Sequence, residues 1–195
     1  MVGSPNILIA YFSRKGENYL NGSIVDLPVG NTEVAAKLIQ GLAGGDLFRI
    51  DTVQAYPADY QKCTEVARQE LDCGARPELS GKVPDLDGYG VVFLGYPNWW
   101  NTMPMAVWTF LEGGDFSGKT ILPFCTHEGS GIGNSESDIR KLCPGAKVLR
   151  GLAIRGGGVR QSGSSLSAWL RRSGLPLGAG EAVPVARDVF EKRPH

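Results

Sequence analysis

Cysteine and histidine are scarce in this chain, and their spacing does not match common metal or redox-dithiol motifs. The sequence has four cysteines and two histidines in 195 residues, and no two cysteines form a C-x-x-C pair. A structural zinc site needs closely spaced ligand pairs, and a redox dithiol needs adjacent cysteines. We therefore expect no metal site, and reduced cysteines of the kind found in cytosolic proteins.

A charge excess of either sign is also missing. Twenty basic and twenty acidic residues give a formal net charge of zero, so no global field would attract nucleic acid or an anionic membrane. The first apolar run is too short for a signal-peptide core or a transmembrane helix, and no charged leader precedes it. We expect a cytoplasmic protein that binds neither nucleic acid nor a membrane.

Apolar residues make up 42% of the chain, which suffices for one sizeable core and predicts one main domain, residues 1–176. Short apolar runs alternate with segments of helical periodicity. The runs predict strands at 6–13, 47–50, 91–95, 120–126 and 148–154, and the periodic segments predict helices at 32–42, 59–73, 104–111, 135–143 and 164–172. This alternation predicts a doubly wound α/β fold with a parallel sheet. Residues 177–195 fit no element and are expected to form a C-terminal tail.

The segment between the first strand and the first helix is polar and unusually long. Residues 14–30 contain several glycines, asparagines and a proline, and we interpret them as a long loop insertion that is too rich in breakers for a helix. Asn31 or Thr32 is a suitable N-cap, and Gly44-Gly45 a suitable end, for the helix that follows. Free backbone N–H groups at such a helix start stabilise an anionic phosphate.

Two later loops also follow predicted strands. The first contains Pro97-Asn98-Trp99-Trp100-Asn101, where an aromatic wall meets polar backbone, and the second runs from Thr126 to Gly131. The pattern Ser135-x-x-Asp138 then predicts a capping box at the start of a short helix. Because the carboxyl ends of parallel strands share one edge of a sheet, we expect the loops to meet there.

Read together, these motifs resemble the flavodoxin-like family. The resemblance rests on Tyr11-Phe12-Ser13 with Gly30-Asn31-Thr32, on Gly95-Tyr96-Pro97-Asn98-Trp99-Trp100, and on Thr126-His127-Glu128-Gly129-Ser130-Gly131, and it covers residues 6–175. It implies a five-stranded parallel sheet of order 2-1-3-4-5 with helices on both faces. It also implies FMN at the carboxyl edge of the strands, a rule for which flavodoxin itself is a standard example.

The resemblance further implies which residues bind FMN. They are Ser13, Lys15, Asn18, Asn31, Thr32, Pro97, Asn98, Trp99, Trp100, Asn101, Thr126, His127, Glu128, Gly129, Ser130 and Gly131. Ser13, Asn31 and Thr32 would hold the phosphate. The insertion departs from the short S-x-x-G-N-T turn of simpler members, so Arg14 or Lys15 either pairs with the phosphate or is solvated.

The aromatic loop and the histidine each have two interpretations. One tryptophan covers a face of the flavin, with Trp100 favoured and Trp99 as a wall or anchor, or both only pack. His127 either lies near the flavin N1 region or has a structural role.

The resemblance implies an FMN-binding oxidoreductase or electron-transfer protein. Carriers in this family are markedly acidic, so zero net charge favours an enzyme that passes electrons from NAD(P)H to a quinone-like acceptor. The alternative is a flavodoxin-fold binding or signalling module without FMN catalysis. The electron donor, the acceptor and the oligomeric state are left open.

Two other classes on α/β sheets fit the sequence poorly. A serine hydrolase needs G-x-S-x-G, whereas Glu128 replaces the first glycine before Ser130, and the only later histidine is His195. A receiver domain needs acidic residues after the first strand, where this chain has Ser13, Arg14 and Lys15.

Overall fold

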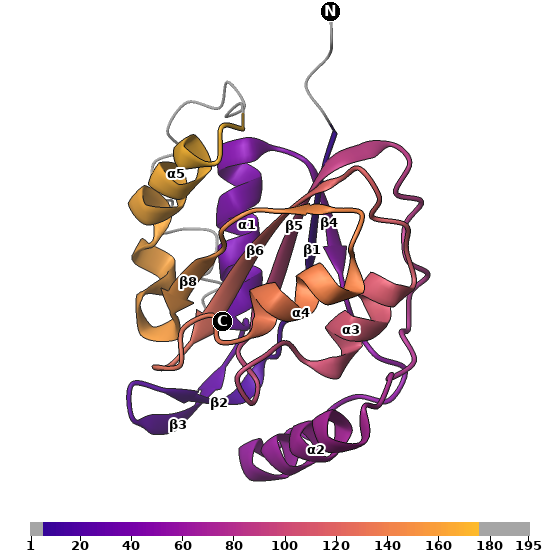
Figure 1. The fold of residues 1–195 in the computed structure, drawn as a ribbon. Helices are drawn as coiled ribbons and strands as arrows, with labels where there is room; N and C mark the ends of the chain where they lie inside the picture. Colours follow the sequence, from indigo (N-terminus) through magenta and orange to yellow (C-terminus); the bar gives the residue numbers. More distant parts are fainter. Residues whose placement is uncertain (1–5, 176–195) are drawn as a thin grey trace, which may run out of the picture.

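The computed structural model describes residues 6–175, which form a parallel sheet between two layers of helices (Figure 1). The strand order is β4-β1-β5-β6-β7, and β8 also pairs with β6. The strands are β1 Asn6–Tyr11, β4 Asp46–Arg49, β5 Tyr89–Pro97, β6 Thr120–His127, β7 Lys147–Val148 and β8 Leu152–Arg155. The predicted doubly wound fold and its strand order are therefore confirmed. The tail predicted at 177–195 lies outside the described residues.

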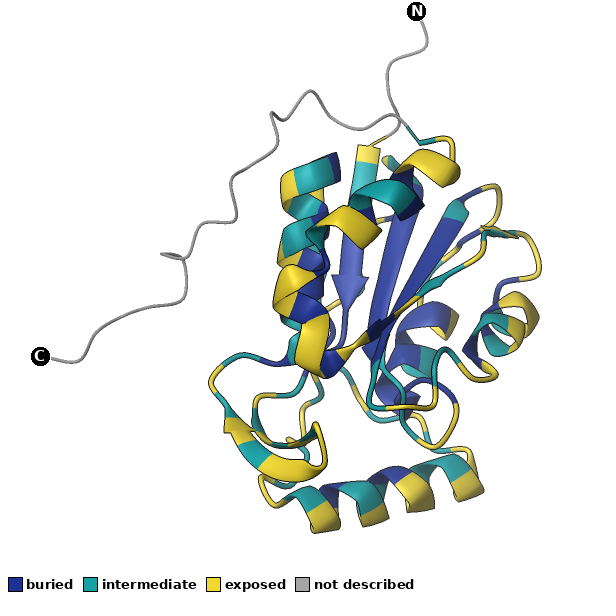
Figure 2. Cartoon of the chain, turned by 90° about the vertical axis from the view of Figure 1, so that its left-hand side faces the viewer, coloured by how far each residue is buried: buried dark blue, intermediate teal, exposed yellow. Residues whose placement is uncertain are grey.

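Each face of the sheet is covered by two helices, and the strands between them are buried (Figure 2). Helices α1 (Asn31–Ala43) and α5 (Gly163–Arg172) pack on one face, and α3 (Met105–Glu112) and α4 (Ser135–Leu142) pack on the other. Along β1, Ile9 contacts the α1 side, whereas Leu8 and Ala10 contact the α3 side. Burial on both faces explains why these strands are continuously apolar in sequence.

Helix α2 (Tyr60–Cys73) lies beyond the carboxyl ends of the strands instead of on a sheet face (Figure 1). It begins after Asp59, whose side chain accepts a hydrogen bond from the Lys62 N–H at 2.8 Å, and ends at Gly74 in the left-handed region. These ends agree with the prediction. Within α2, only Cys63 and Ala67 are buried, so the helix leaves much of its surface for other contacts.

The insertion is ordered as a β-hairpin, so the prediction of a loop was wrong. Strands β2 (Gly16–Leu20) and β3 (Ser23–Leu27) pair antiparallel and form a separate two-stranded sheet beside α2 (Figure 1). The turn residues Asn21 and Gly22 both have positive φ, 51° and 94°. Asn-Gly is the preferred pair for such a two-residue hairpin turn.

The last predicted strand, 148–154, is divided into β7 and β8. The chain turns at Gly151, whose N–H donates to Glu136 at 2.8 Å and whose missing Cβ would lie 2.8 Å from the Pro123 carbonyl oxygen. The division also explains how β6 accommodates Pro123. This proline lies between the residues that pair with β7 and those that pair with β8, where no ladder bond is needed.

Two predicted helix caps were wrong. At the start of α1, the Ser13 hydroxyl from the preceding loop accepts a hydrogen bond from the Glu33 N–H, so a side-chain cap within the helix is not needed. The N-cap of α1 is Gly30, not Asn31 or Thr32. The N-cap of α4 is Asn134 without a side-chain bond, so no capping box forms. The Ser135 hydroxyl instead donates to the Ile132 carbonyl at 2.6 Å and accepts from the Tyr96 hydroxyl at 2.8 Å.

The remaining boundaries are close to the predictions. Helix α1 ends at Gly44, and α3 begins directly after Pro104. A 3-10 helix, η1 (Gly156–Gln161), connects β8 to α5. Within residues 6–175, no helix has the length and apolarity to cross a membrane. The same part of the chain contains no cluster of three metal-ligating His, Cys, Asp or Glu side chains.

Candidate functional site

A cleft of about 750 Å³ opens at the carboxyl ends of β1, β5 and β6. Its base is formed by the loops after these strands and by the start of α1, and its outer wall by β2 and α2. Open parallel sheets bind ligands at this edge. The site lies where the loops from two neighbouring strands lead to helices on opposite faces of the sheet. A cleft of this size is typical of small-molecule sites.

The start of α1 forms one end of the cleft. Asn31, Thr32 and Glu33 occupy the first three helical positions, so their N–H groups have no acceptor within the helix. The Glu33 N–H donates to the buried Ser13 hydroxyl at 3.0 Å. The N–H groups of Asn31 and Thr32 thus remain available to a ligand, in the positive field of the helix N-terminus.

Gly30 is the position at which this end of the cleft tolerates no side chain. An added Cβ would lie 2.8 Å from the Arg14 carbonyl carbon and closer still to the Ser13 hydroxyl. The absence of a side chain therefore brings residues 13 and 14 directly against the start of α1. This close packing places the Ser13 hydroxyl beside the free N–H groups.

Thr32 and Thr126 connect the helix start to the carboxyl end of β6. Their hydroxyl groups are 2.8 Å apart and both side chains are buried. Each hydroxyl can donate one hydrogen bond and accept others. When Thr126 donates to Thr32, the Thr32 proton is free for an anion in the cleft.

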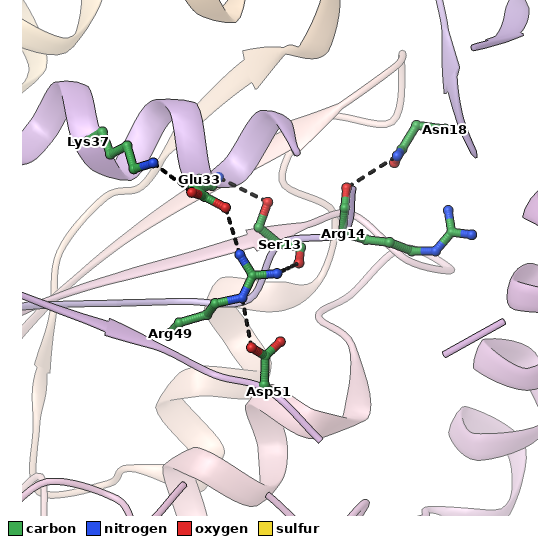
Figure 3. A network of polar contacts seen from close by, with 7 residues as sticks. All are labelled: Ser13, Arg14, Asn18, Glu33, Lys37, Arg49 and Asp51. Carbon is green, nitrogen blue, oxygen red and sulfur yellow. Dashed lines mark hydrogen bonds and ion pairs between the residues drawn. The ribbon is translucent and has the colours of Figure 1, made fainter. Parts of the chain in front are cut away.

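Arg14 is used to hold the cleft together. Its guanidinium donates to the Pro57 carbonyl at 2.7 Å and also bonds the Ala58 and Glu17 carbonyls. Its side chain points away from Ser13 (Figure 3). Lys15 is exposed and lies outside the residues that line the cleft. A phosphate at the start of α1 would therefore be held without a lysine.

The hairpin is fixed to both sides of the cleft. The Glu17 carboxylate accepts a hydrogen bond from the Tyr60 N–H at 2.8 Å, and the Tyr19 ring stacks on the Tyr60 ring. At the turn, the Asn21 N–H donates to Glu128 Oε2 at 3.0 Å. The hairpin thus bridges α2 and the loop after β6, and encloses the cleft from outside.

The two tryptophans of the aromatic loop have different surroundings. Trp99 packs edge-on against Phe12 and Tyr56, with ring centroids 5.2 and 5.0 Å away. Trp100 is 48% exposed, although its indole N–H donates to the Thr64 carbonyl at 3.0 Å. Arg68 lies over the Trp100 ring at 5.2 Å. Trp99 is therefore part of the packing beneath the loop, and Trp100 offers exposed ring surface to the cleft.

The backbone of this loop is held in an uncommon conformation. Trp100 and Asn101 both have positive φ, 51° and 70°, which for a bulky residue such as tryptophan requires support from its surroundings. Asn98 gives that support, since its side chain accepts from the Asn101 N–H at 3.0 Å and donates to the Gly131 carbonyl at 2.9 Å. The same side chain thus joins the two loops that border the cleft.

The last residue of β6, His127, contributes a neutral imidazole, and the loop after it contributes a carboxylate. Burial lowers the pKa of His127 below its ordinary value, and its Nδ1 accepts from the Gly129 N–H at 2.9 Å. The ring is therefore neutral at pH 7, with its proton on Nε2. Among the side chains of residues 6–175, Glu128 Oε1 is buried and has no hydrogen-bond partner. A carboxylate oxygen only accepts, so a ligand here needs an O–H or N–H group.

Most of the sequence-predicted site residues meet in this cleft. Those that line it are Ser13, Asn18, Asn31, Thr32, Pro97, Asn98, Trp99, Trp100, Asn101, Thr126, His127, Glu128 and Ser130. Lys15, Gly129 and Gly131 do not line it. The outer wall was not predicted from the sequence; it includes Tyr19, Tyr60, Gln61, Cys63, Thr64, Ala67 and Arg68. Burial raises the pKa of the Cys63 thiol, so this side chain is not a reactive thiolate at neutral pH.

The chain was also compared with known protein families and structures. A family model described as flavodoxin matches residues 6–173. No curated protein sequence matches the chain. Among solved structures, a protein of Bacteroides eggerthii classed as a flavoprotein is 31% identical, with 89% of this chain and 100% of that chain covered and a TM-score of 0.72.

Two further structures are similar over most of their length. A protein of Bacteroides uniformis, also classed as a flavoprotein, is 29% identical, with 87% of this chain and 99% of that one covered and a TM-score of 0.67. A flavoprotein of Lactobacillus acidophilus solved in complex with FMN is 18% identical, with coverage of 83% and 99% and a TM-score of 0.57. At this identity the third structure supports the fold alone.

Proposed function

Since this chain belongs to the flavodoxin family, we propose that it binds FMN in the cleft and acts as an FMN-dependent oxidoreductase. The observation that supports this most strongly is the start of α1, where two free N–H groups and two hydroxyls converge. A phosphate monoester fits such a nest. The connection after β1 also lacks the G-x-G-x-x-G turn that binds a dinucleotide pyrophosphate.

The rest of the cleft fits the other parts of FMN. The unpartnered Glu128 Oε1 would accept a hydrogen bond from a ribityl hydroxyl or a ring N–H. Gly156 packs directly against Glu128 Oε1 and the Asn31 amide, since a Cβ at Gly156 would collide with both. The exposed Trp100 ring supplies apolar surface for a flat ring system.

When bound, FMN supplies reversible two-electron or one-electron redox chemistry. The protein's own groups bind, orient and shield it. Ser13, Asn31 and Thr32 would hold the phosphate end, and the Trp100 loop and His127 at the end of β6 would border the ring end. The neutral His127 offers an N–H donor from Nε2 and adds no positive charge. Zero net charge favours an enzyme with a small acceptor over an acidic carrier protein.

The proposal is tested by an absorption spectrum and an anaerobic redox cycle of the purified protein with FMN. We expect a bound flavin spectrum that bleaches on reduction with NADH or NADPH and returns when a soluble quinone is added under argon. A flavin that binds but is reduced only by dithionite would favour a carrier. Absence of flavin binding would favour the alternative, a flavodoxin-fold binding or signalling module.

Thr32 provides a test of the phosphate end. We expect Thr32→Ala to weaken FMN binding by about 1 to 2 kcal/mol, which lies between the contribution of a neutral hydrogen bond and that of one to a charged group. Riboflavin has no phosphate, so its affinity should hardly change. The measurement is fluorescence titration of both flavins. Equal losses for FMN and riboflavin would mean that the hydroxyl only links the loops through Thr126.

A further inference from the structure

Arg49, at the carboxyl end of β4, contacts the loop that precedes the proposed phosphate site. The parallel register pairs Arg49 with Tyr11, so its side chain reaches Ser13 just past the end of β1. Its Nη2 donates to the Ser13 carbonyl at 2.9 Å, its Nη1 to Glu33 at 2.6 Å and its Nε to Asp51 at 2.8 Å (Figure 3). Each of the three guanidinium nitrogens therefore has an acceptor.

Glu33 completes a closed set of contacts around Ser13. The Glu33 N–H donates to the Ser13 hydroxyl at 3.0 Å, while the Glu33 carboxylate accepts from Arg49 at 2.6 Å. Ser13 is thus held through its carbonyl by Arg49 and through its hydroxyl by the start of α1. Because the two holding residues also bond each other, the orientation of the Ser13 hydroxyl is coupled to the Arg49–Glu33 pair.

The same pair controls the charge next to the site. Burial alone would raise the pKa of Glu33, but its bonds to Lys37 and Arg49 lower it below the ordinary value, so Glu33 is ionised at neutral pH. A carboxylate in the first turn of a helix is attracted by the same positive N-terminal field that attracts a phosphate. Unpaired, it would repel a bound dianion. Arg49 and Lys37 offset that repulsion, with N–O distances of 2.6 and 2.7 Å.

We propose that Arg49 is a positioning residue that determines the preference of this cleft for a phosphorylated flavin. It does so by orienting Ser13 and by neutralising Glu33, without contacting the flavin itself. This inference rests on the proposed function, because it assumes FMN with its phosphate at the start of α1. Neither Arg49 nor Glu33 was predicted from the sequence to be a site residue.

The test compares the dissociation constants of FMN and riboflavin for Arg49→Met, which keeps most of the side chain's apolar length. We expect FMN affinity to fall by about 10- to 100-fold, the range for loss of a charge-assisted hydrogen bond. Riboflavin affinity should stay within about 3-fold. Arg49→Lys should recover only part of the loss, because an ammonium group cannot serve three separate acceptors in the same way.

The electrostatic part is tested in the double variant Arg49→Met/Glu33→Gln. In Arg49→Met the Glu33 carboxylate keeps Lys37 as its partner but loses Arg49. Removing this less completely neutralised carboxylate should restore part of the FMN affinity lost in Arg49→Met. The ³¹P chemical shift of bound FMN gives a readout that is independent of affinity, and it should change in Arg49→Met. An unchanged shift together with no recovery in the double variant would overturn the proposal.

Arg76 provides a matched control. Its side chain is 35% exposed, like that of Arg49. Its Nε forms an ion pair with Glu112 Oε2 at a distance of 2.7 Å, and neither residue lines the cleft. Arg76→Met should leave the FMN-to-riboflavin ratio unchanged. If the unmodified protein does not distinguish FMN from riboflavin, the proposed phosphate site itself fails. If it does distinguish them and Arg49→Met keeps the same ratio, only the role of Arg49 is refuted.

Discussion

Gly30→Ala is expected to weaken FMN binding by about 3 kcal/mol, or roughly 100-fold, the upper range for forcing a methyl group into a packed site. The added Cβ would lie 2.8 Å from the Arg14 carbonyl carbon and closer to the Ser13 hydroxyl. The loop must then move away from the start of α1, which separates the Ser13 hydroxyl from the N–H groups of Asn31 and Thr32. Isothermal titration with FMN and with riboflavin measures the effect, and FMN should lose more.

Gly41→Ala is a matched control in the same helix. Gly41 is exposed, and a Cβ added there would meet no atom within 4 Å. Alanine at this position should leave flavin affinity unchanged and raise stability by up to about 1 kcal/mol through helix propensity. A Gly30→Ala protein that folds and keeps the FMN-to-riboflavin ratio of the parent would contradict the assignment of the phosphate end.

Trp100→Ala is expected to weaken FMN binding by about 1 to 3 kcal/mol, the range for loss of a ring stacked on a base. Both tryptophans line the cleft, but Trp100 is 48% exposed, whereas the Trp99 ring is packed against Phe12 and Tyr56. An electron-rich ring against the flavin disfavours added negative charge, so its removal should also raise the reduction potential of bound FMN. Flavin fluorescence quenching and a potentiometric titration measure the two effects.

Trp108 is the control for this substitution. Its ring also lies 5.2 Å from a guanidinium, that of Arg76, but it does not line the cleft. Trp108→Ala should therefore leave flavin quenching and potential as in the parent. Trp99→Ala should act mainly on stability, since its ring is part of an aromatic cluster under the loop. Unchanged quenching and potential in both Trp99→Ala and Trp100→Ala would refute a stacking role for this loop.

The parallel sheet could be predicted because its strands are buried on both faces and are therefore continuously apolar. The run before Ser13 and the run before Pro97 both become central strands, β1 and β5. Their loops then had to meet at one edge, which is why residues as distant as Ser13 and Trp100 could be assigned to one cleft.

The hairpin was missed although the sequence contains a signal for it. Asn21-Gly22 separates two five-residue segments, each with β-branched or aromatic residues, and both turn residues adopt positive φ. The many glycine and asparagine residues of 14–30 favoured a loop instead. Because the hairpin was missed, so was the contribution of Tyr19 to the cleft wall.

Arg49 could not be found from sequence for a different reason. Its role depends on the register between β1 and β4, which pairs Tyr11 with Arg49 and thereby brings the guanidinium to Ser13. Periodicity predicts that a strand exists but does not fix its neighbour's register to one residue. The failed capping box at Ser135 is similar, since a hydrogen bond from the distant Tyr96 occupies that hydroxyl.

The most direct test of the account is a competition titration of the flavin-free protein with FMN, FAD and riboflavin. The cleft has a nest for one phosphate at the start of α1 and no turn of the kind that binds a dinucleotide. We therefore predict that FMN binds most tightly, with an affinity at least about 10-fold higher than that of riboflavin or of FAD. Tighter binding of FAD than of FMN, or equal binding of FMN and riboflavin, would contradict it.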